Sequence, residues 1–177
     1  MRSTVGLDVA APAELVFRLA RDVERWPELL PHYARARRLR VESGGALVVE
    51  FVARRQVLPW IGLAIPVTWR SRTWSDPATL RLRFAHLGGA TAGMDVTWRI
   101  APTPGGCHVE IEHRFRRTLP VPVLGQLIGP DVFPRFVDRF FTRPIAGRTL
   151  ATFRALAEAL RDDDLQSART IPTNTVR

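Results

Sequence analysis

The stretch MDVTWRIAPTPGGCHVEIEHRF, residues 94–115, decides the fold. On both sides of a central turn, apolar residues recur at every second position, with Asp, Thr, Arg, His or Glu between them; His113 occupies an otherwise apolar position. This period-two alternation predicts strands with one buried and one solvated face. Residues 103–106, Thr-Pro-Gly-Gly, supply a turn signal between them. We therefore predict an antiparallel hairpin.

The same pattern extends towards the N-terminus. From Tyr33 to about Arg117, short strand-like runs are divided by turn signals, at residues 43–45, 76–77, 87–89 and 103–106. This spacing leaves no room for crossover helices between the strands. We expect an antiparallel meander of about six strands.

The ends of the chain complete the pattern. Residues 4–10 read as a further strand, and Pro12 suits the start of a short helix with one apolar stripe. A second short helix is expected over residues 22–30, interrupted at Trp26-Pro27. Residues 145–160 predict a longer amphipathic helix near the C-terminus.

These elements predict an α+β fold in which about seven strands curl around the last helix. A single helix cannot fill so broad a concave face, so a cavity lined by inward strand residues should remain. We expect one ligand-binding domain over residues 1–161, including an apolar insertion at 119–144. Residues 162–177 are polar and are predicted to be a disordered tail.

Composition excludes several classes of function. The formal charge is +9, and every basic residue is arginine. Arginines alternate with apolar residues, as in Leu80–Phe84, which indicates the wet face of a strand, so we do not expect a nucleic-acid partner. The single cysteine, Cys107, and the absence of zinc-ligand spacing argue against disulfides and a metal site. We expect no cofactor. Without a signal-peptide core or an apolar run long enough to span a membrane, the sequence predicts a cytoplasmic protein.

Several segments carry a family resemblance. They are APAELVF at 11–17, DVERWPELLPHY at 22–33, WRSR at 69–72, MDVTWR at 94–99 before Gly105-Gly106, and IAGRTL at 145–150. Together they resemble the polyketide cyclase/aromatase branch of the START-like (SRPBCC, Bet v 1-like) superfamily. The resemblance implies the helix-grip fold, in which two short helices follow the first strand.

The resemblance also implies a use for the cavity. In the aromatase/cyclases, a tyrosine after the Trp-Pro segment and an arginine on a middle strand face the cavity, and Tyr33 and Arg72 are the matching residues here. The function expected is binding of a hydrophobic small molecule that is polyketide-like, a lipid or an isoprenoid, with cyclase or dehydratase activity left open. The alternative is a lipid or quinone carrier that acts at a membrane surface without catalysis.

The orientation of the arginine strand stays open at this point. Thr68, Arg70 and Arg72 share one face, and Trp69 and Ser71 share the other, so a shift of one residue exchanges which set points inward. The candidate ligand-binding residues are Trp26, Leu30, Trp69, Arg70, Trp98, His113, Phe140, Phe141 and Phe153.

Two apolar segments, 57–66 and 119–144, have no place in a minimal helix-grip core. They could enlarge the core, gate the cavity, form a homodimer surface or contact a membrane.

Overall fold

The structure is a computed structural model of the 177-residue chain. It describes residues 2–58, 63–89, 91–115, 135 and 138–170, except the side chains of residues 57, 58, 140, 141 and 164–170. The predicted insertion at 119–144 therefore lies largely outside the described residues, as do the predicted apolar segment's residues 59–62.

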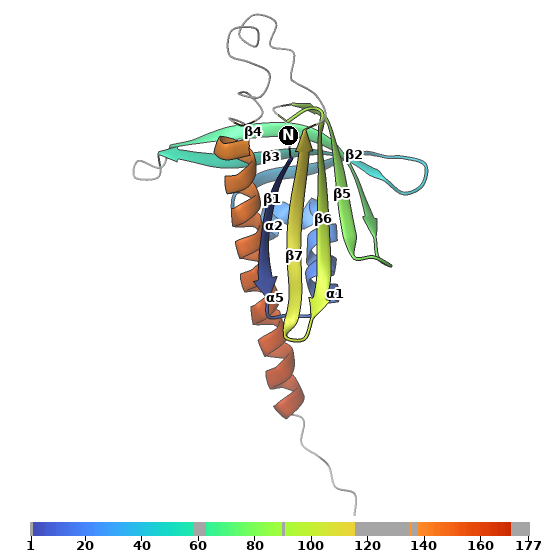
Figure 1. The fold of residues 1–177 in the computed structure, drawn as a ribbon, viewed down its shortest axis with the longest axis vertical. Coiled ribbons are helices and arrows are strands. Elements are labelled where there is room, and N and C mark those ends of the chain that lie inside the picture. Colours follow the sequence, from blue (N-terminus) through green and yellow to red (C-terminus); the bar gives the residue numbers. More distant parts are fainter. Residues whose placement is uncertain (1, 59–62, 90, 116–134, 136–137, 171–177) are drawn as a thin grey trace, which may run out of the picture.

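Seven antiparallel strands form one curved sheet (Figure 1). Its order, β1-β7-β6-β5-β4-β3-β2, makes a continuous meander from β2 to β7 and places β1 beside β7. This confirms the predicted meander. The strands are β1 (Arg2–Val9), β2 (Tyr33–Val41), β3 (Leu47–Leu58), β4 (Leu63–Asp76), β5 (Arg81–Gly89), β6 (Met94–Thr103) and β7 (Gly106–Phe115).

Three short helical segments connect the two edge strands, β1 and β2. They are α1 (Ala13–Arg21), the 3-10 turn η1 (Val23–Arg25) and α2 (Trp26–Leu29). Pro12 lies at the N-cap of α1, and Pro27 lies in the first turn of α2, where a missing N–H costs no helical hydrogen bond. The break expected at Trp26-Pro27 is the junction between η1 and α2.

The long helix α5 (Arg143–Thr170) follows a π-helical turn, η3 (Asp138–Thr142), and packs against β1 and α1. It is longer than predicted, because it runs through residues 162–170, which were expected to be disordered. Extending an existing helix avoids the cost of nucleation, so polar residues can continue it without a buried face. The last turns of α5 project beyond the sheet in Figure 1. In the part of the chain that the structure describes, no helix has the length and apolar character of a membrane span.

The hydrophobic core fills the concave side of the sheet. In the hairpin of β6 and β7, Trp98 pairs with Ile111 and Ile100 pairs with Val109, and all four side chains are buried. The predicted alternation of the hairpin thus sets which residues face the core. The helix-grip architecture that the resemblance implied is confirmed.

Candidate functional site

A pocket lies on the concave side of the sheet, beneath the first turns of α5. Its empty volume is about 580 Å³, including space open to solvent. Strands β2 to β7, helix α2 and the segment from η3 to α5 all contribute to its wall. The lining residues are Trp26, Tyr33, Phe51, Val67, Trp69, Phe84, His86, Thr91, Met94, Val96, Trp98, Ile111, His113, Thr142, Ile145, Ala146 and Thr149.

Aromatic rings form most of the deep wall. The Trp26 indole lies 5.0 Å from the Tyr33 ring and 5.5 Å from the Phe51 ring, measured between centroids. Phe51 and Trp69 are stacked, with centroids 5.3 Å apart and planes 19° apart. Such a wall offers large, rigid apolar surfaces to a ligand.

A first polar cluster lies on strands β5 and β7, in the turn between β5 and β6, and at η3. His86 Nδ1 lies 2.5 Å from the Thr91 hydroxyl oxygen. Two other buried atoms at the pocket, His113 Nδ1 and the Thr142 hydroxyl, have no hydrogen-bond partner among the described residues. Burial lowers the pKa of His113 to about 4 and that of His86 to about 3, so both imidazoles are neutral at pH 7.

Charged groups stand behind His113. The Ser3 hydroxyl donates a short hydrogen bond to Asp138, and Arg143 Nε donates to the other carboxylate oxygen of Asp138 over 2.9 Å. Ser3 is also the register partner of His113 between β1 and β7. The Asp138 charge raises the pKa of His113 and the Arg143 charge lowers it, but burial has the largest effect.

A second polar cluster joins the start of β2 to α5. The Thr149 hydroxyl donates to the Ile145 carbonyl over 2.8 Å, and its oxygen lies 2.9 Å from His32 Nε2. A hydrogen bond also links Thr149 to Tyr33. Burial raises the pKa of the Tyr33 phenol, which therefore keeps its proton at neutral pH. Burial and the Arg148 charge lower the pKa of His32 to about 4.

Of the candidate residues named from the sequence, Tyr33, Trp26, Trp69, Trp98 and His113 all line the pocket. Two more, Leu30 and Phe153, are buried in the surrounding core without lining it. The side chains of the candidates Phe140 and Phe141 lie outside the described residues.

Strand β4 turns its two candidate arginines away from the pocket. Val67, Trp69, Ser71 and Thr73 are buried on the inner face, so the period-two geometry leaves Arg70 and Arg72 exposed on the outer face. Arg72 Nε lies 2.7 Å from Glu42 Oε2. The sequence leaves the orientation of this strand open, and the structure places the candidate residues Arg70 and Arg72 away from the pocket.

Sequence reasoning missed several polar residues of the site. The turn signal at Leu87-Gly88-Gly89 predicts that the strand ends near His86, but β5 continues to Gly89 and His86 lies within it. His86 follows Leu82 and Phe84 at every second position of the strand, and this alternation could have predicted that its side chain points inward. Thr149 follows Ile145 by four positions, which is one helical turn on the same face. His32, Thr91 and Thr142 carried no periodic signal.

Metal ligation finds no support in the described part of the chain. There, no group of three or more His, Cys, Asp or Glu side chains is arranged to hold a metal ion.

Solved structures with the same fold include aromatase/cyclases. The Zhui aromatase/cyclase from Streptomyces sp. R1128 is 23% identical, with a TM-score of 0.68, over 89% of this chain and 93% of that chain. The di-domain ARO/CYC StfQ from the steffimycin biosynthetic pathway is 20% identical, with a TM-score of 0.69, over 91% of this chain and 52% of that chain. A START superfamily protein from Mycobacterium smegmatis is 20% identical, with a TM-score of 0.55, over 93% and 97%. At these identities the likeness shows the fold.

No curated protein has a matching sequence. A family model does match, over residues 2–158, and it covers the sheet, the pocket and most of α5. This chain therefore belongs to the family described as polyketide cyclase/dehydrase and lipid transport.

Proposed function

We propose that this protein binds an apolar small molecule carrying polar groups at one end. The observation that carries this proposal is the pair of unpartnered buried atoms, His113 Nδ1 and Thr142 Oγ1, in a pocket otherwise walled by aromatic rings. A buried polar atom without a partner costs about 1 to 3 kcal/mol. A ligand hydroxyl donating to His113 and a ligand oxygen accepting from Thr142 would recover that cost.

The wall favours a flat, unsaturated ligand over a saturated chain. The stacked rings of Phe51 and Trp69, and Trp26 beside them, present faces and edges that complement fused rings. A polyketide-like ligand therefore fits better than a lipid or an isoprenoid. A lipid or an isoprenoid would contact the apolar wall but would not stack on its aromatic rings.

A binding titration tests this proposal. The probe is 2,3-dihydroxyanthraquinone, whose hydroxyl groups lie at one end of the ring system and cannot reach the quinone carbonyls. Palmitic acid is the saturated comparison, and the readouts are tryptophan quenching and calorimetry. Because each substitution removes one hydrogen-bond partner, Thr142→Val and His113→Phe should each weaken anthraquinone binding about 5- to 10-fold. Arg72→Ala, on the outer face, should leave binding unchanged. Absence of binding by the unaltered protein, or equal affinity in all three variants, would overturn the proposal.

A second candidate function is acid–base chemistry on a β-keto substrate. It is favoured by the combination of neutral imidazoles and a protonated phenol in one pocket. His113 would take a proton from a carbon between two carbonyls, and the enolate carbon would attack a ketone carbon of the same chain. Tyr33 would donate its proton to the resulting alkoxide. The Tyr33 phenolate would then take the second proton from the attacking carbon as protonated His113 returns its proton to the hydroxyl, which leaves as water and gives the carbon–carbon double bond.

A product assay tests the second candidate. With a synthetic poly-β-keto thioester, Tyr33→Phe and His113→Gln should each lower the enzymatic rate at least about 100-fold, the usual contribution of a general acid or base. Arg72→Ala serves as the matched outer-face control. Product formation no faster than in buffer would leave ligand binding as the function.

A further inference from the structure

The outer face of the curved sheet carries its charge unevenly. Alternate residues of a strand point to the same face, so the register shows which charged side chains share it. On strands β1, β6 and β7, outward arginines meet outward carboxylates: Arg2, Arg99 and Arg114 with Asp8, Asp95, Glu110 and Glu112. This half of the outer face has no excess of positive charge.

The other half, on strands β2 to β5, has an excess of arginine. Two glutamates each pair with two arginines over 2.7 to 3.5 Å, Glu50 with Arg35 and Arg37, and Glu42 with Arg40 and Arg72. Arg70 of β4 and Arg83 of β5 are exposed, and neither has an acidic partner within the described parts of the chain. A general preference for arginine in the sequence would affect both halves, so the excess arises from where the carboxylates lie.

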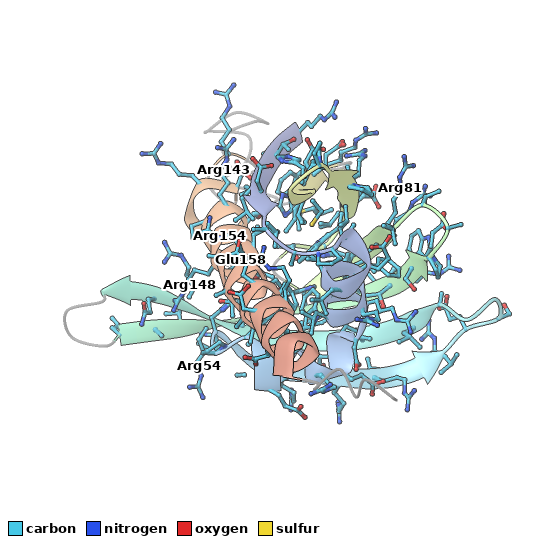
Figure 2. All side chains as sticks on the ribbon, turned by 90° about the horizontal axis from the view of Figure 1, so that it is seen from below. Arg54, Arg81, Arg143, Arg148, Arg154 and Glu158 are labelled. Atoms are coloured by element: carbon cyan, nitrogen blue, oxygen red, sulfur yellow. The ribbon has the colours of Figure 1, made fainter. Side chains whose placement is uncertain are left out.

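The outward side chains of β2 to β5 form one continuous surface. The strand register places Arg37, Glu50 and Arg70 side by side across β2, β3 and β4. It also places Trp74 beside Arg83 across β4 and β5, and Trp74 shares the outer face of β4 with Arg70. Figure 2 shows α5 inside the curve of the sheet, so this surface lies on the opposite side of the sheet from α5. We call it the basic face and define it by Arg35, Arg37, Arg40, Arg70, Trp74 and Arg83.

Trp74 lies among the arginines of the basic face and is 37% exposed. The Arg72 guanidinium carbon lies 5.6 Å from the centroid of the Trp74 ring, and Arg72 Nε lies 2.7 Å from Glu42 Oε2. These two contacts hold the indole in one arrangement before a partner binds, so less side-chain freedom is lost on binding. An exposed tryptophan beside arginines is typical of the residues that carry most of the binding energy in protein interfaces.

We propose that the basic face binds the acidic surface of another protein. A guanidinium group binds a carboxylate through two parallel hydrogen bonds, and Arg70 and Arg83 can do so without breaking an existing ion pair. The indole of Trp74 adds rigid contact area between them. The inference is independent of the proposed function, because a partner on the outer face of the sheet leaves the pocket on the inner face free.

Other anionic partners fit the basic face less well. Single-stranded nucleic acid binds through bases that stack on several aromatic rings, whereas Trp74 is the only aromatic side chain among the exposed large hydrophobic residues that the structure describes. A double helix is read by an element that enters a groove, which the outer face of a curved sheet does not supply. A bilayer takes up a row of apolar side chains, and the basic face offers one indole.

Fluorescence anisotropy with a labelled glutamate-rich peptide tests the basic face, because the peptide presents carboxylates as an acidic protein surface does. Each exposed ion pair contributes about 2- to 3-fold, so Arg70→Gln with Arg83→Gln should weaken peptide binding about 4- to 10-fold. Trp74→Ser should weaken it about 5-fold. The matched control, Arg18→Gln with Arg154→Gln, removes the same charge from α1 and α5; Figure 2 shows Arg154 on α5. Because salt screens charges across the thickness of the fold, the control should change peptide binding less than about 2-fold.

Two further probes separate an acidic protein from other polyanions. An oligothymidylate with the same net charge as the peptide should bind more weakly than the peptide. Vesicles containing phosphatidylglycerol should bind the basic-face variants and the control equally. No peptide binding by the unaltered protein, equal losses in the control, tighter binding of the oligothymidylate, or vesicle binding that only the basic-face variants lose would each overturn the proposal. Far-ultraviolet circular dichroism should be the same for all variants, so that a loss of binding is distinguished from a loss of fold.

Discussion

At the scale of single residues, His113 is the clearest departure from a well-satisfied core. It occupies an inward position on β7 between Ile111 and Phe115, where the alternation calls for an apolar side chain. It is buried, and its Nδ1 atom has no partner among the described residues. Natural proteins often keep residues at functional sites that lower the stability of the fold. An unpartnered buried imidazole at a pocket is consistent with this pattern.

His113→Phe should stabilise the unliganded protein by about 1 kcal/mol, because it removes an unpaired buried polar atom next to a pocket with room for the larger ring. Urea unfolding at pH 7 measures the change in unfolding free energy. His108→Gln, at a half-buried site on the outer face beside Asp8, is the control and should change stability by less than about 0.5 kcal/mol. A destabilised His113→Phe protein would show that the imidazole is satisfied in the native state.

The buried histidines also predict how stability depends on pH. Their usual pKa is 6.5, whereas in the folded chain it is about 4 for His32 and His113 and about 3 for His86. Between pH 6.5 and 4 the unfolded chain therefore binds more protons than the folded chain, and stability falls as the pH falls. Each histidine contributes a slope of about 1.4 kcal/mol per pH unit.

Urea unfolding at several pH values checks this dependence. Stability should be flat with respect to these groups above pH 7 and should decline from about pH 6.5 downwards. In His113→Phe, the unfolding free energy should fall less steeply with decreasing pH, because one of the three buried histidines no longer contributes to the slope. An unchanged slope in that variant would mean that His113 titrates normally in the folded chain.

At the scale of elements, a charged clamp ties three strands together on the outer face. Glu112 of β7 is only 1% exposed, because Arg2 of β1, Arg99 of β6 and Arg114 of β7 surround its carboxylate. Hydrogen bonds from Arg114 and Arg99, together with the arginine charges, lower the pKa of Glu112 to about 2. The clamp joins the first strand of the chain to the last hairpin.

Glu112→Gln should cost about 1 to 2 kcal/mol of unfolding free energy at pH 7, since the partner arginines are partly exposed and solvent screens them. A carboxylate with a lowered pKa stabilises above its usual value of 4.5, and this stability is lost as the pH falls towards 2. Between pH 4.5 and 2, the unfolding free energy of the variant should therefore decrease less than that of the unaltered protein, as measured by unfolding at pH 2 to 5. Glu110→Gln, at a more exposed carboxylate, is the control and should cost less than about 0.5 kcal/mol.

At the scale of the whole molecule, Trp26 connects the helical segment to the sheet and to α5. Its ring lies within 6.1 Å of five other aromatic rings, counted between centroids, which come from β2, β3, β5, β6 and α5: Tyr33, Phe51, Phe84, Trp98 and Phe153. Its indole N–H donates to the Ala20 carbonyl over 3.0 Å. One side chain thus packs against most layers of the fold.

Trp26→Phe should lower the unfolding free energy by about 2 to 3 kcal/mol, because it leaves a cavity and an unpaired carbonyl. Trp74→Phe is the matched control, since Trp74 is 37% exposed on the outer face of β4, and its effect should stay below about 0.5 kcal/mol. Thermal and urea unfolding of the two variants give the comparison. Equal changes in unfolding free energy in the two variants would show that the contacts of Trp26 do not stabilise the fold more than those of the exposed Trp74.

The sequence by itself determined the strands, the meander and the presence of a covering helix. These follow from local rules: period-two alternation from Met94 to Phe115, turn residues at fixed offsets, and helical spacing after Ile145. It also carried the family resemblance that the match over residues 2–158 confirms.

Only the tertiary structure decided which face of each element meets the pocket. Alternation divides β4 into two faces but cannot say which is inner; burial of Val67 and Trp69 does, and it turns Arg72 outward. In the same way, His86, His113, Thr142 and Thr149 become one site only because β5, β7, η3 and α5 converge. Local patterns fix how a side chain alternates along its own element, whereas contacts between residues distant in sequence fix what it faces.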